Sequence, residues 1–239
     1  MESELTRLDH FQIYDIFPMG VNYDGAFLEG QFDKVPKEVN IKIFEHIATP
    51  VSKNGAPIQD ENAHFTGYVM RTPRPEPERT VVIRNQFGTQ ELRIGLATVL
   101  LVPAEKLEPG LSFPAGLDHY ECYRVVVGDS VDRDVSLRDQ FDSRTGVPVT
   151  FPLLFCVPIV KTYGKETTTI SRPRAHLTFY RIEPEEYSIP RTFRDQFATT
   201  DVTVVRSVML GVPTRKIKWA VAPDFVAPQG VIPDPMPLS

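Results

Sequence analysis

The sequence repeats itself four times, and this internal repetition constrains the fold more than any other feature of the chain. In each unit a His is followed four residues later by a Tyr, then by a Gln-Phe pair, and then by a Pro with a Lys three residues after it. These residues are His10/Tyr14, Gln31-Phe32 and Pro50/Lys53 in the first unit, His64/Tyr68, Gln86-Phe87 and Pro103/Lys106 in the second, His119/Tyr123, Gln140-Phe141 and Pro158/Lys161 in the third, and His176/Tyr180, Gln196-Phe197 and Pro213/Lys216 in the fourth. Because four of the five histidines occupy one repeat position, we infer that the units share one structural plan.

The units alternate in type. The first and third open with Leu-Asp-His, whereas the second and fourth open with Ala-His. This alternation favours two similar domains, each made of a pair of units. We predict a first domain over residues 1–114, with units 8–61 and 62–114, and a second over residues 115–222, with units 117–174 and 175–222. Residues 107–116, rich in Pro and Gly, are the expected linker.

The composition predicts strands rather than helices. Val and Thr are abundant, and their branched side chains pack well on a pleated sheet. The 22 Pro and 14 Gly leave little room for long helices. We therefore predict an all-β fold of four repeats of about 55 residues, arranged as two β-sandwich or small-barrel domains. The alternative is a single closed ring of four units, such as a four-bladed propeller, because this period is near the size of a blade.

Side chains alternate along a strand, so each His-x-x-x-Tyr strand has two different faces. One face carries the His and the Tyr. The other carries Phe11/Ile13, Phe65/Gly67, Tyr120/Cys122 and Leu177/Phe179. This second face is mostly apolar, and we expect it to lie in a core.

Charge and hydropathy exclude several classes of protein. The net charge of −5 provides no basic surface for the phosphate backbone, so we expect no nucleic-acid partner. The longest apolar run, residues 151–160, has ten residues with two prolines and is too short to span a bilayer. The amino-terminal residues have neither a basic start nor an apolar stretch, so we expect no signal peptide in this sequence.

The third unit carries the most specific strings. It reads His119-Tyr120-Glu121-Cys122-Tyr123, then Asp139-Gln140-Phe141, and then Leu154-Phe155-Cys156-Val157-Pro158 with Lys161. These strings resemble a tandem repeat of predicted secreted bacterial proteins of unknown function, in which HYxCY, DQFG and LLCxPxxK signatures recur. The resemblance covers residues 8–221. It implies an extracellular or cell-envelope location, although the sequence itself leaves a cytoplasmic one open, and it supplies no activity.

The two cysteines stand at repeat positions whose equivalents are Ile13 with Ala48, Gly67 with Leu101, and Phe179 with Gly211. Two of these pairs set a larger residue against a small one, as adjacent core positions would. We predict that Cys122 and Cys156 are neighbours, and that they are bonded if the protein is secreted. Closing this 34-residue loop would stabilise the fold by about 3–4 kcal/mol in the chain-entropy model.

The repeat histidines allow two interpretations. If the units surround an axis, His10, His64, His119 and His176 could converge and bind Zn or Cu. Alternatively, each His makes a structural hydrogen bond within its own unit, since repeats usually duplicate structural residues. We favour the second interpretation and expect no cofactor. The four repeat lysines follow strand ends, and we expect them to be solvated or paired with a neighbouring acid.

His46 departs from the repeat, because Val99, Leu154 and Met209 stand at its position in the other units. A single His in a broken repeat position is a candidate functional residue. The candidate catalytic residues are therefore His46, together with His119 and Tyr123 as an acid–base pair. No Gly-x-Ser-x-Gly, P-loop, Gly-x-Gly-x-x-Gly, His-Glu-x-x-His or paired CxxC motif is present.

A polar stripe recurs on the Gln-Phe segments. Its members are Arg84 with Gln86, Arg138 with Gln140, and Arg194 with Gln196, and they are the candidate binding residues. Tandem polar β units suit a carbohydrate or protein ligand bound at several shallow sites. The tail, residues 223–239, holds five prolines and could mediate self-association along the edge of a neighbour's sheet.

We therefore favour a non-enzymatic binding or structural and assembly protein, for which the resemblance implies a bacterial cell surface. The alternative is an enzyme with a His/Tyr or metal site at the interface of the repeat pairs.

Overall fold

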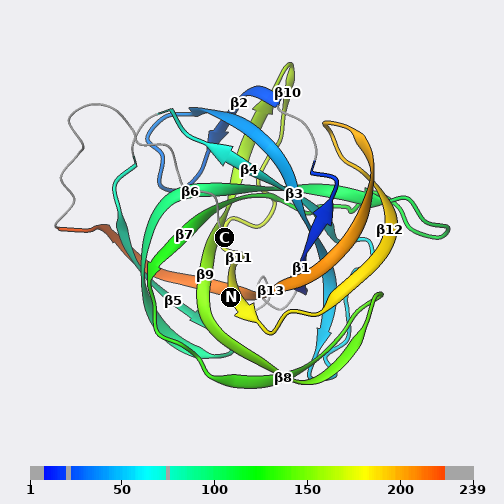
Figure 1. Ribbon diagram of the computed structural model, residues 1–239. Coiled ribbons are helices and arrows are strands. Elements are labelled where there is room, and N and C mark those ends of the chain that lie inside the picture. The colour runs from blue at the N-terminus through cyan, green and yellow to red at the C-terminus, as the bar shows by residue number, and fades with distance from the viewer. Residues whose placement is uncertain (1–7, 20–22, 74–75, 224–239) are drawn as a thin grey trace.

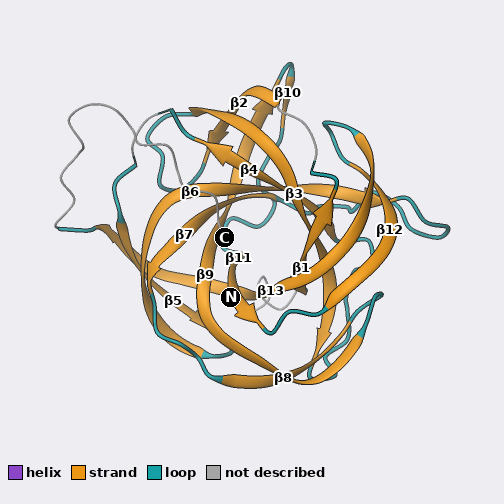
Figure 2. Cartoon of the chain, viewed as in Figure 1, coloured by secondary structure: helices purple, strands orange, loops and turns teal. Residues whose placement is uncertain are grey.

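The computed structural model describes residues 8–19, 23–73 and 76–223, and its regular structure is β-strand throughout (Figures 1 and 2). The predicted all-β class is confirmed. Within these residues no helix is long and apolar enough to span a membrane. The Pro-rich tail, apart from Pro223, lies outside the described residues.

Each unit contributes a first strand that begins at the repeat His, a short middle strand and a long third strand. The first unit forms β1 (His10–Phe17), β2 (Tyr23–Glu29) and β3 (Lys37–Lys53), and the second forms β4 (His64–Arg71), β5 (Arg79–Asn85) and β6 (Gly88–Lys106). The third forms β7 (His119–Val127), β8 (Arg133–Arg138) and β9 (Ser143–Tyr163), with a short β10 (Glu166–Thr167) folded back on β9. The fourth forms β11 (His176–Ile182), β12 (Glu186–Arg194) and β13 (Thr199–Val221).

Eight of these strands pair in a closed order. Each first strand lies between its own third strand and the third strand of the preceding unit, and β1 pairs in the same way with β13 of the fourth unit. The antiparallel order β1-β3-β4-β6-β7-β9-β11-β13 therefore returns to β1. Figure 1 shows these strands curving around a common centre, and we call this element the ring.

The middle strands link units that are two apart. β2 pairs with β3 of its own unit and with the end of β9, while β8 pairs with β9 and with the end of β3. β5 and β12 link the second and fourth units in the same reciprocal way. The strand pairing is thus continuous across residues 114 and 115, where we predict a domain boundary, because β6 pairs with β7.

The apolar face of the first strands fills the inside of the ring. Side chains from all eight ring strands form one buried cluster, including Phe11, Phe65, Tyr120 and Phe179. Within it the Sγ atoms of Cys122 and Cys156 form a disulfide of 2.02 Å between directly opposed residues of β7 and β9. The other faces of the ring strands pack beneath the middle strands in two further clusters.

Gly211 is the position where the inside of the ring is tightest. It lies opposite Phe179, and a methyl group on Gly211 would overlap the Phe179 ring. We predict that Gly211→Ala lowers the free energy of unfolding by about 1–3 kcal/mol, because an overfilled core strains its neighbours. Urea denaturation measures this loss. The second change Phe179→Leu should recover most of it, and a double variant no more stable than G211A would contradict this packing.

Candidate functional site

Each repeat His contacts the repeat Gln of the following unit. Its contacts are therefore not confined to its own unit. Nε2 of His10 lies 2.5 Å from Nε2 of Gln86, and the corresponding distance between His64 and Gln140 is 3.2 Å. His119 interacts with Gln196 in the equivalent way, but within the described residues its Nε2 makes no hydrogen bond. His176 closes the cycle with Gln31 of the first unit at 2.5 Å. The expectation that each His is satisfied within its own unit is therefore only half correct.

The hydrogen bonds require these histidines to be neutral. Nδ1 of His64 lies 3.0 Å from the carbonyl oxygen of Asn62, so Nδ1 carries the proton and Nε2 accepts one from the Gln amide. Gln86 is oriented to do this, because its Oε1 accepts a hydrogen bond from Lys53 Nζ at 2.7 Å. Burial and a nearby repeat lysine lower the histidine pKa values. They fall to about 4 for His10 and His64 and to about 3 for His119 and His176.

Three of the four repeat lysines are buried rather than solvated, and Lys106 pairs with the neighbouring acid Glu108 at 2.7 Å, as the second alternative predicts. Lys53, Lys106 and Lys161 are buried, and the amine of Lys53, Lys161 or Lys216 lies over the repeat Phe of the next unit. Burial lowers the pKa of Lys161 to about 8. These ammonium groups pack on aromatic side chains. The long third strands extend beyond the ring of strands and so place the lysines at the Gln-Phe turn of the neighbouring unit.

The four histidines sit in four separate His–Gln contacts. Among the residues that the structure describes, no three His, Cys, Asp or Glu side chains are grouped so as to hold a metal ion. The arrangement needed for the Zn or Cu alternative is thus not formed by His10, His64, His119 and His176.

Three of the four repeat Tyr residues reach the residue before the Gln in the unit two away. Tyr14 donates to Asp139 Oδ2 at 2.5 Å, Tyr68 donates to Asp195 at 2.6 Å, and Asn85 donates to Tyr180 at 2.8 Å. The same Asp or Asn side chains accept the backbone N–H groups of their own turns, as Asp139 does from Phe141 at 2.8 Å. The Gln-Phe pairs therefore lie in turns whose shape is held from a distant unit.

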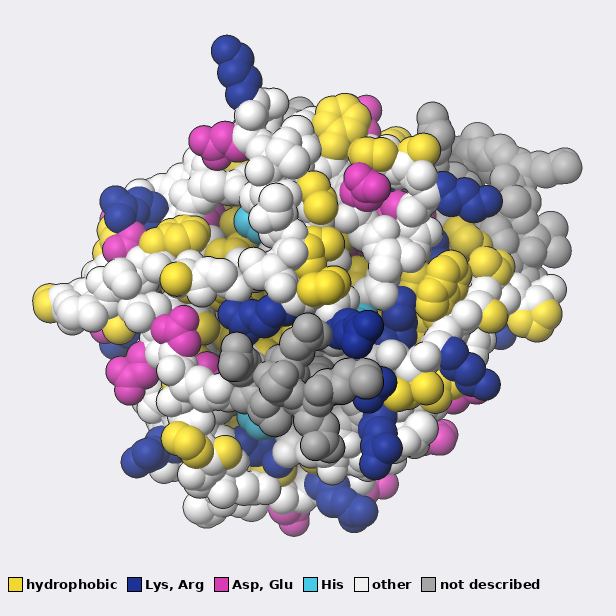
Figure 3. All heavy atoms as spheres, turned by 180° about the vertical axis from the view of Figure 1, so that it is seen from behind, with side chains coloured by type: hydrophobic (Ala, Val, Ile, Leu, Met, Phe, Trp, Pro, Cys, Tyr) yellow, Lys and Arg dark blue, Asp and Glu magenta, His cyan; other side chains and the backbone are white. Residues whose placement is uncertain are grey.

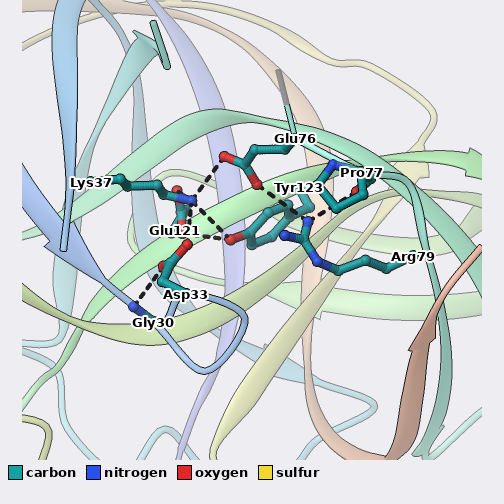
Figure 4. Close-up of polar contacts among 8 residues, drawn as sticks. All are labelled: Gly30, Asp33, Lys37, Glu76, Pro77, Arg79, Glu121 and Tyr123. Carbon is teal, nitrogen blue, oxygen red and sulfur yellow. Dashed lines mark hydrogen bonds and ion pairs between the residues drawn. The ribbon is translucent and has the colours of Figure 1, made fainter. Parts of the chain in front are cut away.

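One copy of this Tyr–Asp contact is rebuilt with different residues (Figure 4). The first unit has Gly30 where the others have Asn85, Asp139 and Asp195. Tyr123 instead donates to Glu121 of its own strand at 2.6 Å. A Cβ atom on Gly30 would lie 3.3 Å from Asp33 Oδ2 and 3.6 Å from Glu121 Oε2, so these two carboxylates together occupy the space of the missing Asp.

The rebuilt copy is a buried charge cluster drawn from three units. Lys37 Nζ lies 2.8 Å from Glu121, 2.8 Å from Glu76 and 3.2 Å from Asp33, and Arg79 pairs with Glu76 at 3.2 Å. Burial raises the pKa of Glu121 to about 7, against the opposing effect of Lys37. Burial alone would lower the pKa of Lys37, but the carboxylates of Glu121 and Glu76 raise it above its ordinary value. The cluster contains three carboxyl groups and only two cations. This balance favours one of the carboxyl groups staying protonated.

His46 lies at one end of the ring, on the face that continues the enclosed core. Its Nδ1 is 3.0 Å from Asp15 Oδ1, and Asp15 Oδ2 accepts from Arg206 at 2.6 Å. His46 fits there because it opposes Gly67, where a Cβ would lie only 3.0 Å from the Cβ of His46. Val99, Leu154 and Met209 fill the equivalent positions and are nearly buried. We call this end of the ring, where His46 lies and where the first strands run on past their repeat Tyr residues, the open end.

The other predicted site residues are dispersed. His119 and Tyr123 belong to different contacts, with Gln196 and Glu121 respectively. Gln86 and Gln140 are engaged by histidines, whereas Arg84 and Arg138 are exposed on separate middle strands, and Arg194 pairs with Glu105. Ligand binding by the polar stripe stays a prediction.

The surface of the described residues has shallow hollows. One hollow of about 270 Å³ is lined by Leu107, Glu108, Pro190, Arg191, Thr192, Asp201 and Val202, and another of about 180 Å³ lies around Ser136 and Arg144. Figure 3 shows Lys and Arg side chains gathered around the middle of the rear face, with histidines visible among them. Neither hollow contains His46, His119, Tyr123 or Glu121.

Acid should destabilise the fold through the repeat histidines. Their pKa values are lower in the folded state than the ordinary 6.5, so below pH 6.5 the unfolded chain binds more protons. Stability is complete above pH 6.5 and falls as the pH approaches 4. Glu121, Asp9 and Asp139 oppose this, because burial raises their pKa values and the folded chain binds their protons more readily. Urea denaturation at pH 7.5, 6 and 5 checks the slope, and constant stability over this range would contradict neutral, buried histidines.

Glu121 and Gly30 should behave as an exchanged pair. Gly30 lacks a positive φ, so Asp is allowed there by the backbone, but Gly30→Asp alone adds a carboxylate beside those of Asp33 and Glu121. Glu121→Thr alone removes the acceptor of Tyr123. We expect each single variant to lose about 1–3 kcal/mol. The double variant recreates the pattern of the second unit, with Thr66 and Asp195, and should regain at least about 1 kcal/mol by coupling. Additive losses in denaturant titrations would disprove the exchange.

Comparison with known proteins identifies the repeat. A family model described as a repeat of unknown function (DUF7450) matches residues 64–213, which span the second, third and fourth units. Searches of the curated proteins and of the solved structures give no match. The predicted resemblance to an uncharacterised repeat family is confirmed at this level. The chain belongs to the DUF7450 repeat family.

Proposed function

We propose that this protein is a non-enzymatic binding module that holds its ligand at the open end of the ring. The observation that carries the proposal is the contrast between two sets of polar side chains. The repeat His, Gln, Lys and Tyr residues bind one another across units in the interior. At the open end, Arg124 and Arg181 are exposed, and within the described residues their side chains have no hydrogen bond or ion pair.

Burial of the titratable groups supports binding rather than catalysis. Glu121 is 0% exposed and His119 is 9% exposed, so a substrate has no route to them in this conformation. Their pKa shifts follow from burial and from structural ion pairs, which perturb pKa values without any catalytic role.

The disulfide supports an extracellular or cell-envelope location. Cys122 and Cys156 are bonded within the core, and such bonds persist in oxidising compartments. A rigid, closed sheet with a stapled interior is a suitable platform for a ligand-binding end in that setting.

Amide chemical-shift mapping tests the proposal. The isotope-labelled protein is titrated with panels of glycans and peptides, and we expect shifts confined to the ends of β1, β7 and β11 and to His46. Shifts confined to another face, or turnover of any panel compound, would contradict a binding module that acts through the open end.

A further inference from the structure

The open end consists of successive layers of equivalent side chains. Residues that alternate along the first strands fall on the inner face of the ring. The enclosed layers are apolar, whereas the residue after each repeat Tyr forms an outer layer. Its members are Asp15, Val69, Arg124 and Arg181, and the next layer holds Phe17, Arg71, Val126 and Glu183.

The exposed side chains of the outer layer are positively charged. Asp15 is partly buried and bonded to both His46 and Arg206, which together lower its pKa despite its burial. Arg124 and Arg181 have no such partner and are exposed. Since the whole chain carries a net charge of −5, this local excess of cations is not a consequence of composition.

The spacing of the two arginines suits a polymer with repeated anionic groups. β7 and β11 both flank β9, where Arg124 pairs with Leu154, and Leu154 in turn pairs with Phe179, two residues before Arg181. Two strand spacings across and two residues along place their Cα atoms about 12 Å apart. Each guanidinium can take one carboxylate with two parallel hydrogen bonds.

The apolar neighbours point to sugar rings. Phe17 is 65% exposed and Val126 is 51% exposed, and both belong to the layer next to the arginines. An exposed aromatic side chain offers a flat apolar surface to the ring of a sugar. A peptide that adds a strand is disfavoured, because both edges of every first strand in the ring are already paired.

From these features we infer that the open end binds a carboxylate-bearing polysaccharide, a chain of uronic acid residues, through Arg124 and Arg181. This inference rests on the proposed function and names the class of its ligand. Arg124 and Arg181 hold separate carboxylates, while Phe17 and Val126 pack against the sugar rings.

Calorimetric titration with an oligogalacturonate at low salt tests the inference. The double variant R124Q/R181Q should bind about a hundredfold more weakly than the natural chain, at about tenfold for each lost charged hydrogen-bonding partner. Its affinity should also depend less on salt. The matched control R174Q/R215Q removes the same charge from exposed positions just before β11 and on β13, and it should bind like the natural chain. Equal thermal midpoints for the three proteins show that folding is intact.

Three outcomes would overturn the inference. Equal losses in the two double variants would mean that binding follows net charge alone. Tighter binding of a neutral galactan or of polyglutamate, lost in F17A/V126A, would leave the open end as a binding site but with another class of ligand. Absence of oligogalacturonate binding, with no probe shifting residues of the open end, would remove both the inference and the proposed function.

Discussion

Every first strand in this fold is held between third strands of two different units, and the rest of the structure depends on this pairing. β1 lies between β3 and β13, so the first and last units are joined as directly as any consecutive pair. The ring therefore leaves no first strand with a free edge, and its enclosed core is built by all four units at once. The middle strands add a second set of links between units two apart.

The polar repeat residues follow the same two rules of connection. His, Gln and Lys join a unit to the next one, whereas Tyr and Asp or Asn join units that are two apart. Buried polar groups are stable only when their partners are in place, so these contacts favour the complete ring over partial assemblies. The first unit has Gly30 where the other units have Asp or Asn. The contact between distant units is still kept there, because Glu121 supplies a carboxylate to the same space.

The sequence predicts what is local and repeated. The all-β class, the four units, the apolar face of the first strands and the neighbouring cysteines follow from residue type and period alone. The partner of each repeat His does not, since nothing in the string around His10 indicates that Gln86 rather than Gln31 is its neighbour. The solvation predicted for Lys161 is wrong for the same reason: the ring of Phe197 that covers it belongs to another unit. The layered arrangement at the open end also depends on ring closure, which the local pattern does not contain.

The closed pairing is tested most directly by producing residues 1–114 and 115–239 as two separate chains. Each half would lack partners for one first strand and for two middle strands. The account predicts that neither half alone shows a cooperative unfolding transition, and that an equimolar mixture forms a one-to-one complex that does. Two halves that each unfold cooperatively, at midpoints unchanged by mixing, would contradict the interdependence of the four units.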